Sequence, residues 1–160
     1  SGGKNIQGVD YQGLVNMVNA ATKAKIRRFL YISSINVGKA PSQFVQELKH
    51  FYQINDLSVP EGLLANTEKS AYHNYVKIKE KAERNLINSG INYTVLRAGL
   101  LTQGQGTGKI DITEGTLNAF GKISRENVAA AFIEVLENKN TYQKTYTILD
   151  GEVPIPKVFM

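Results

Sequence analysis

The stretch IRRFLYISSIN, residues 26–36, decides the fold of this chain. Its first eight residues are nearly continuous in β-forming types, as expected for a strand buried in a parallel sheet. A helical stripe of apolar residues lies before it, and Leu14, Val15, Val18, Ala21 and Ala24 form that stripe. A helix that runs directly into a buried strand favours an α/β fold.

The same alternation continues along the chain. Residues 68–89 predict a long helix that stops at Gly90, and residues 91–97 predict a second strand. Ser124 can cap a helix that reaches about Leu136, and residues 145–150 predict a third strand. Residues 98–123 are Gly-rich and irregular, with a short strand at KIDIT. We therefore predict a single α/β domain over residues 1–160, with a doubly wound Rossmann-type parallel sheet and helices on both faces.

Composition excludes several classes of function. The chain has 160 residues, 42% hydrophobic and 21% charged, and no cysteine, which excludes disulfides, thiolate catalysis and cysteine zinc sites. No apolar run approaches the roughly 20 residues that a membrane helix needs. We expect a cytoplasmic protein that does not bind membranes.

The net charge of +5 is spread over the sequence rather than clustered, so nucleic-acid binding is not expected. His50 and His73 lie far apart and match no metal-ligand spacing, so no metal site is expected either.

Residues 37–67 form a long connection between the first strand and the long helix. A long loop at the carboxyl end of a strand in an open α/β sheet lies where ligands bind. FVQELKHFYQI inside it predicts a short helix. We expect a lid-like insertion, although position alone also allows a plain surface loop.

YVKIK, residues 75–79, places Tyr75 and Lys79 four residues apart, on one face of the predicted helix. A nearby ammonium favours the phenolate of a tyrosine and makes the hydroxyl a better acid or base. The spacing is common in amphipathic helices, so the pair alone decides nothing. A strand that ends in Ser33 and Ser34 adds hydroxyls that could bind a substrate carbonyl, and strand alternation sends the two to opposite faces.

Three segments together resemble the atypical short-chain dehydrogenase/reductases, in their NmrA-like, NAD(P)-binding branch. They are VDYQGLVNMVNAATKAKIRRFLYISSIN, YHNYVKIKEKAERNLINSGINYTVLRAGLLTQGQGTGKIDI and ISRENVAAAFIEVLEN. They occur in the family's order and cover nearly all of the chain outside residues 37–67. This linked pattern is far more specific than a tyrosine and lysine four residues apart.

The resemblance implies catalytic roles for three side chains. Ser34 matches the catalytic serine, with Ser33 as the alternative in the doublet and a cofactor contact. Tyr75 matches the catalytic tyrosine. Lys79 matches the lysine that holds the nicotinamide ribose and acidifies the tyrosine.

The resemblance also implies contacts to the cofactor. Ala98, Gly99 and Leu100 match the loop that packs along the nicotinamide, although the family commonly has proline where this chain has Ala98. Gly2 and Gly3 resemble the end of the fourth-strand loop beside the cofactor. The implied cofactor is NADP, with NAD as an alternative.

One part of the family pattern is missing from the sequence. A dinucleotide fold opens with a strand, a Gly-rich turn and a helix, and no such unit precedes the first helix here. GQGTG, residues 104–108, follows the wrong strand and precedes no long helix. We therefore expect the domain to be N-terminally incomplete. We also expect weak dinucleotide binding by these 160 residues alone.

The resemblance implies an NAD(P)-dependent oxidoreductase that reduces a carbonyl or quinone-like small molecule. In this branch some members bind the dinucleotide without turnover, so a non-catalytic NAD(P)-sensing regulator is the alternative. A sheet edge left uncovered could be paired by another chain, so a homo-oligomer is also expected as one arrangement.

Overall fold

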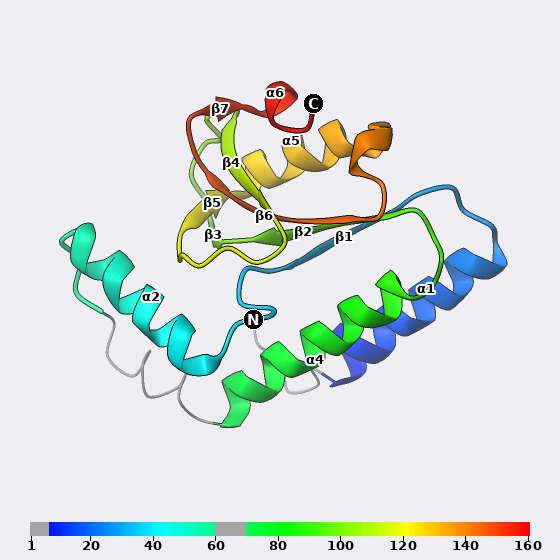
Figure 1. Ribbon diagram of the computed structural model, residues 1–160, viewed down its shortest axis with the longest axis horizontal. Coiled ribbons are helices and arrows are strands. Elements are labelled where there is room, and N and C mark those ends of the chain that lie inside the picture. Colours follow the sequence, from blue (N-terminus) through cyan, green and yellow to red (C-terminus); the bar gives the residue numbers. More distant parts are fainter. Residues whose placement is uncertain (1–6, 60–69) are drawn as a thin grey trace.

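The computed structural model describes residues 7–59 and 70–160, and its centre is a five-stranded sheet in the order β1-β2-β6-β4-β7 (Figure 1). The strands are β1 (Phe29–Ser34), β2 (Tyr93–Ala98), β6 (Lys144–Asp150), β4 (Lys109–Glu114) and β7 (Val153–Pro154). β1, β2 and β6 run parallel, while β4 pairs antiparallel with β6 and with β7. The predicted Rossmann-type fold class is confirmed, and the short strand expected at KIDIT extends the sheet in antiparallel direction.

Helices cover both faces of this sheet (Figure 1). A π-helical segment (Gln7–Gly13), α1 (Leu14–Lys23) and α4 (Ser70–Ile87) lie on one face, and α5 (Arg125–Leu136) and α6 (Ile155–Val158) lie on the other. The predicted apolar stripe is confirmed at three of its positions, since Leu14, Val18 and Ala21 are buried in the core against α4. None of the helices in the described ranges is long and apolar enough to cross a membrane.

β1 is less buried than the sequence predicts. Among its six residues only Ser33 is buried, and Ile32 is 39% exposed. β1 pairs with β2 alone among the described strands, so one side of it has no neighbour there. The expectation of a buried strand was wrong for this reason, although the parallel pairing itself was right.

The Gly-rich segment after β2 forms a small parallel sheet of β3 (Leu100–Thr102) and β5 (Lys122–Ser124). Gly99 stands where this sheet meets the main one. A Cβ atom there would lie 2.5 Å from Leu149 Cδ2 and 2.6 Å from the Gly121 carbonyl oxygen, so only glycine fits. After β5, the Ser124 side chain accepts a hydrogen bond from the Asn127 amide, which confirms the predicted cap of α5.

The insertion at residues 37–67 contains α2 (Pro41–Ile54), which confirms the helix expected there, while residues 60–67 lie outside the described residues. α2 projects to one side of the sheet (Figure 1). The buried Lys39 ammonium binds Glu47 on this helix at 2.5 Å and the Ala119 carbonyl at 2.7 Å. Phe44 and Phe51 also pack edge-to-face on Phe120. These contacts join α2 to the loop before β5.

Candidate active site

A cavity of about 720 Å³ opens at the carboxyl ends of β1 and β2. Its wall draws on α2, α4, the loop before β5 and the start of α5. The sequence-predicted residues that line it are Ser33, Ser34, Tyr75, Lys79, Ala98, Gly99 and Leu100. Seven of the nine predicted site residues therefore share one cavity, and the other two, Gly2 and Gly3, lie outside the described residues.

α4 supplies the tyrosine and the lysine. The Lys79 side chain is mostly buried, and its ammonium donates to the Tyr31 hydroxyl at 3.1 Å and to Asp10 Oδ1 at 3.2 Å. The same ammonium lies 5.2 Å from the centre of the Tyr31 ring. Because an ammonium has three protons, the hydrogen bonds to Tyr31 and Asp10 leave one N–H donor for a ligand.

The electrostatics of the pair differ from the simple expectation. Burial raises the pKa of Tyr75 above its ordinary value, and Lys79 lowers that pKa only in part. Burial acts to lower the pKa of Lys79, but Tyr31, Tyr75 and Asp10 outweigh burial, and the net pKa is raised. At neutral pH the phenol is therefore protonated and the lysine charged, which suits a proton donor beside a fixed cation.

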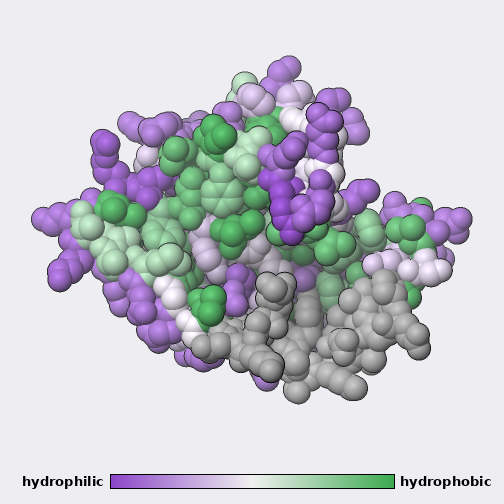
Figure 2. All heavy atoms as spheres, turned by 180° about the vertical axis from the view of Figure 1, so that it is seen from behind, coloured by the Kyte–Doolittle hydropathy of each residue, from purple (hydrophilic) through white to green (hydrophobic). Residues whose placement is uncertain are grey.

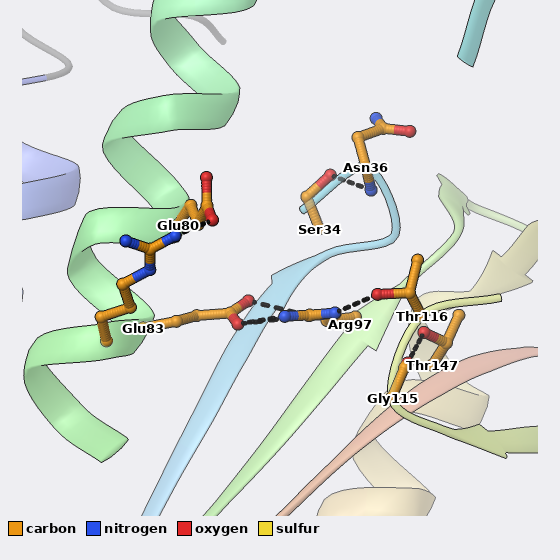
Figure 3. Close-up of polar contacts among 9 residues, drawn as sticks. Ser34, Asn36, Glu80, Glu83, Arg97, Gly115, Thr116 and Thr147 are labelled. Carbon is orange, nitrogen blue, oxygen red and sulfur yellow. Dashed lines mark hydrogen bonds and ion pairs between the residues drawn. The ribbon is translucent and has the colours of Figure 1, made fainter. Parts of the chain in front are cut away.

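The two serines face different sides of the sheet. Tyr31 packs against the α1–α4 core and Leu30 against the α5 core, so alternation puts Ser33 on the α4 face and Ser34 on the α5 face. The Ser33 hydroxyl is buried and has no hydrogen-bond partner among the described residues. The Ser34 hydroxyl accepts a hydrogen bond from the Asn36 amide at 3.3 Å (Figure 3).

A buried ion pair lies one turn beyond Lys79 on α4. Glu83 is 1% exposed and accepts hydrogen bonds from Arg97 Nη2 at 2.7 Å and Arg97 Nε at 3.2 Å. Figure 3 shows the carboxylate and the guanidinium pointing toward one another from α4 and β2. Arg97 Nη1 also donates to the Thr116 hydroxyl at 3.0 Å. This pair attaches the helix that bears Tyr75 to β2, the strand that ends at Ala98.

Sequence reasoning missed several residues of this site. Asp10 gave no local signal, because it lies 69 residues from Lys79. Tyr31 lies two residues before Ser33, and strand alternation could have placed both on one face. Phe44, Leu48 and Tyr52 lie in the helix expected within the lid-like insertion but were not named as site residues, and neither were Phe120 and Arg125.

The glycine-rich segment at residues 104–108, which the sequence did not favour as a phosphate loop, has two of its backbone amides hydrogen-bonded within the protein. The Gly106 amide donates to Glu126 Oε2 at 2.6 Å and the Gly108 amide to Asn127 Oδ1 at 2.9 Å. Within the described ranges, no three His, Asp or Glu side chains gather as metal ligands would.

Comparison with known proteins identifies the family. A protein-family model described as NAD(P)H-binding matches residues 1–139. The chain belongs to this NAD(P)H-binding family. The resemblance to atypical short-chain dehydrogenase/reductases is thereby confirmed at the level of family and fold.

Several individual proteins are similar to this NAD(P)H-binding family member. UPF0659 protein YMR090W of Saccharomyces cerevisiae is 29% identical over 164 residues, which cover 98% of this chain and 62% of the yeast protein. Sanguinarine reductase of Eschscholzia californica is 26% identical over 146 residues, which cover 88% of this chain and 44% of that protein.

Solved structures agree with the fold. The oxidoreductase ylbE of Lactococcus lactis superposes with a TM-score of 0.73 at 24% identity, over 99% of this chain and 62% of that one. An anaerobillin reductase of Escherichia coli O157:H7 gives a TM-score of 0.62 at 25% identity, over 91% of this chain and 60% of that one. The chain thus spans about three fifths of the length of the yeast protein and of both structures.

Figure 2 shows hydrophobic side chains gathered over the middle of the rear face, with polar side chains around them. Among the described residues, Ile32, Leu100 and Leu101 each keep more than a third of their surface exposed, and all three line the cavity. The cavity wall therefore offers apolar surface to a ligand.

Proposed function

We propose that this protein uses NADPH, with NADH as the alternative, to reduce a carbonyl or quinone-like group on a small molecule. The observation that carries the proposal is the meeting of Ser34, Tyr75 and Lys79 with the Ala98–Leu100 segment around one cavity. Membership of the NAD(P)H-binding family supports the cofactor, and the reductase names of two similar proteins support the class of reaction.

The cavity fits the nicotinamide end of such a cofactor. Its volume lies within the roughly 300–1,000 Å³ that is usual for ligand pockets. Ala98 and Gly99 offer backbone and small side chains along one wall, and Lys79 keeps one ammonium proton for a ribose hydroxyl. The bound cofactor would supply the hydride.

In this proposal the chain's own residues handle the substrate oxygen and the proton. Ser34 donates a hydrogen bond to the carbonyl oxygen and orients it. Tyr75 transfers its phenolic proton to that oxygen, and its raised pKa keeps this proton in place at neutral pH. Lys79 holds the ribose and limits the rise in the pKa of Tyr75.

We further propose that residues 37–67 act as a lid over the substrate. Phe44, Leu48 and Tyr52 on α2 line the cavity and would exclude water from the reacting groups. A cytoplasmic location and self-association remain expectations from the sequence.

The test is steady-state NADPH oxidation against a panel of carbonyls and quinones, in a preparation that binds NADPH. Tyr75→Phe should lower kcat by about 10²–10⁴-fold, as expected for loss of a general acid, and should leave NADPH binding intact. Tyr52→Phe is the matched control, because Tyr52 lines the same cavity from α2 and has no proton-transfer role here.

Two results would overturn the proposal. If turnover survives Tyr75→Phe, the phenol is not the proton donor. If NADPH binds tightly and no member of the panel is reduced, the protein is better described as the NAD(P)-responsive regulator that the sequence left open.

A further inference from the structure

The charged side chains that line the cavity have one sign. Among the described residues that line it, Lys79 and Arg125 are cationic, and no aspartate or glutamate is present. The two cations differ in their partners. Lys79 is paired with Asp10 at 3.2 Å, whereas no hydrogen bond or ion pair joins the Arg125 side chain to the described residues.

The carboxylates of Glu126 and Asp150 accept hydrogen bonds from groups other than Arg125. Glu126 accepts a hydrogen bond from the Gly106 amide at 2.6 Å. Asp150 accepts from Asn127 Nδ2 at 2.7 Å and from the Ser124 amide at 3.1 Å. The Arg125 guanidinium is therefore an exposed cation on the cavity wall that forms no ion pair with a carboxylate of the described residues.

Most of the remaining wall is apolar or aromatic. Phe44 and Phe120 meet edge-to-face with ring centres 5.6 Å apart, and Leu48 and Tyr52 extend the same wall along α2. Such a wall favours a flat, largely apolar ligand. A planar guanidinium with five donors matches a carboxylate, which it can bind through two parallel hydrogen bonds.

We propose that the substrate of this site is a flat, mostly apolar molecule with a carboxylate, and that Arg125 binds this carboxylate. The inference rests on the proposed function, because it names the class of molecule that is reduced. In this arrangement the apolar body lies against the α2 wall and the carboxylate reaches the start of α5. Arg125 thus determines substrate choice without taking part in proton transfer.

The test needs no cofactor, so it stays informative if the proposed reduction fails. Calorimetry would compare 2-naphthoate with 2-naphthamide, which differ mainly in charge, on the wild-type chain. We expect 2-naphthoate to bind on the order of tenfold more tightly, as for one charge-assisted contact. Arg125→Gln should abolish most of this preference, and Arg125→Lys should retain part of it.

Lys122→Gln is the matched control. It removes the same charge three residues away, from an exposed lysine that does not line the cavity, so the preference for 2-naphthoate should survive. Three results would overturn the proposal: equal or undetectable binding of the two ligands by the wild-type chain, a preference that survives Arg125→Gln, or an equal loss in both variants. Turnover of 4-carboxybenzaldehyde against benzaldehyde then tests the reduction separately.

Discussion

Two buried charges on one face of α4 have different surroundings. Lys79 and Glu83 are one turn apart, and Tyr75 is one turn before Lys79. Glu83 binds Arg97 through both carboxylate oxygens, at distances down to 2.7 Å, and does not line the cavity. Lys79 makes two hydrogen bonds, of 3.1 and 3.2 Å, to two different residues and lines the cavity.

The comparison distinguishes a charged side chain that only stabilises the fold from one that is also available to a ligand. A carboxylate whose oxygens are filled by a guanidinium can only hold the helix against the sheet. An ammonium that keeps a free proton beside a cavity can also bind a ligand and tune a neighbouring phenol. In the proposed function, two residues four apart on one face of α4 therefore differ in role, with Glu83 serving stability and Lys79 serving chemistry.

The largest expected effect is on stability, at Glu83. Glu83→Ala leaves the Arg97 guanidinium buried without its counter-charge, and we expect about 3–5 kcal/mol of lost stability in urea unfolding. Glu80→Ala is the control on the same helix, because among the described residues Glu80 pairs with the largely exposed Arg84 alone, and it should cost at most a few tenths of a kcal/mol. If the two variants lose the same stability, the buried Glu83–Arg97 pair stabilises the fold no more than an exposed ion pair does.

The next effect is on activity, at Lys79. We expect Lys79→Met to lower kcat/KM for the proposed reduction about a hundredfold while it changes stability by at most about 1 kcal/mol. The stability loss is small because Asp10, its partner, is still partly open to water. Lys77→Met is the control, since Lys77 is exposed on the same helix. A large loss of stability with little change in kcat/KM would make Lys79 a structural residue like Glu83.

Local signals in the sequence predicted most of the fold. The stripe from Leu14 to Ala21 has helical period, Ser124 is a good cap, and the strands stand out by their β-forming residues. Each of these features depends on residues a few positions apart, so each can be recognised without knowledge of the tertiary structure. The tyrosine–lysine pair was found in the same way.

The features that were missed depend on contacts between distant segments. Asp10 and Tyr31 reach Lys79 from 69 and 48 residues away. The exposure of β1 depends on what pairs with its free side. The rise in the pKa of Tyr75 depends on how deeply the fold buries the phenol. The spacing in the sequence identifies Lys79, which lowers the pKa of Tyr75, but it does not reveal the burial, whose effect is larger.

A smaller effect distinguishes the two serines. Ser34→Ala should lower kcat/KM by roughly tenfold, the value of one hydrogen bond to the substrate oxygen. Ser33→Ala should change kcat/KM by less than about threefold and should not reduce stability, because it removes a buried hydroxyl that has no partner among the described residues. If Ser33→Ala lowers kcat/KM more than Ser34→Ala does, then Ser33, on the α4 face, is the residue that orients the substrate.

The smallest expected effect is in the pH dependence of kcat/KM, which reports ionisations of the free enzyme. A general acid must be protonated, and burial raises the pKa of Tyr75 above its ordinary value of 10.0, so kcat/KM for reduction should show no loss from this group between about pH 6 and pH 9. Because Lys79 lowers the pKa of Tyr75, Lys79→Met should move the alkaline limb to still higher pH. Kinetics with a pH-stable carbonyl would check both points. An alkaline limb near neutral pH that disappears in Tyr75→Phe would mean that the lysine outweighs burial after all, and that α4 lowers the pKa of its tyrosine as the spacing alone suggested.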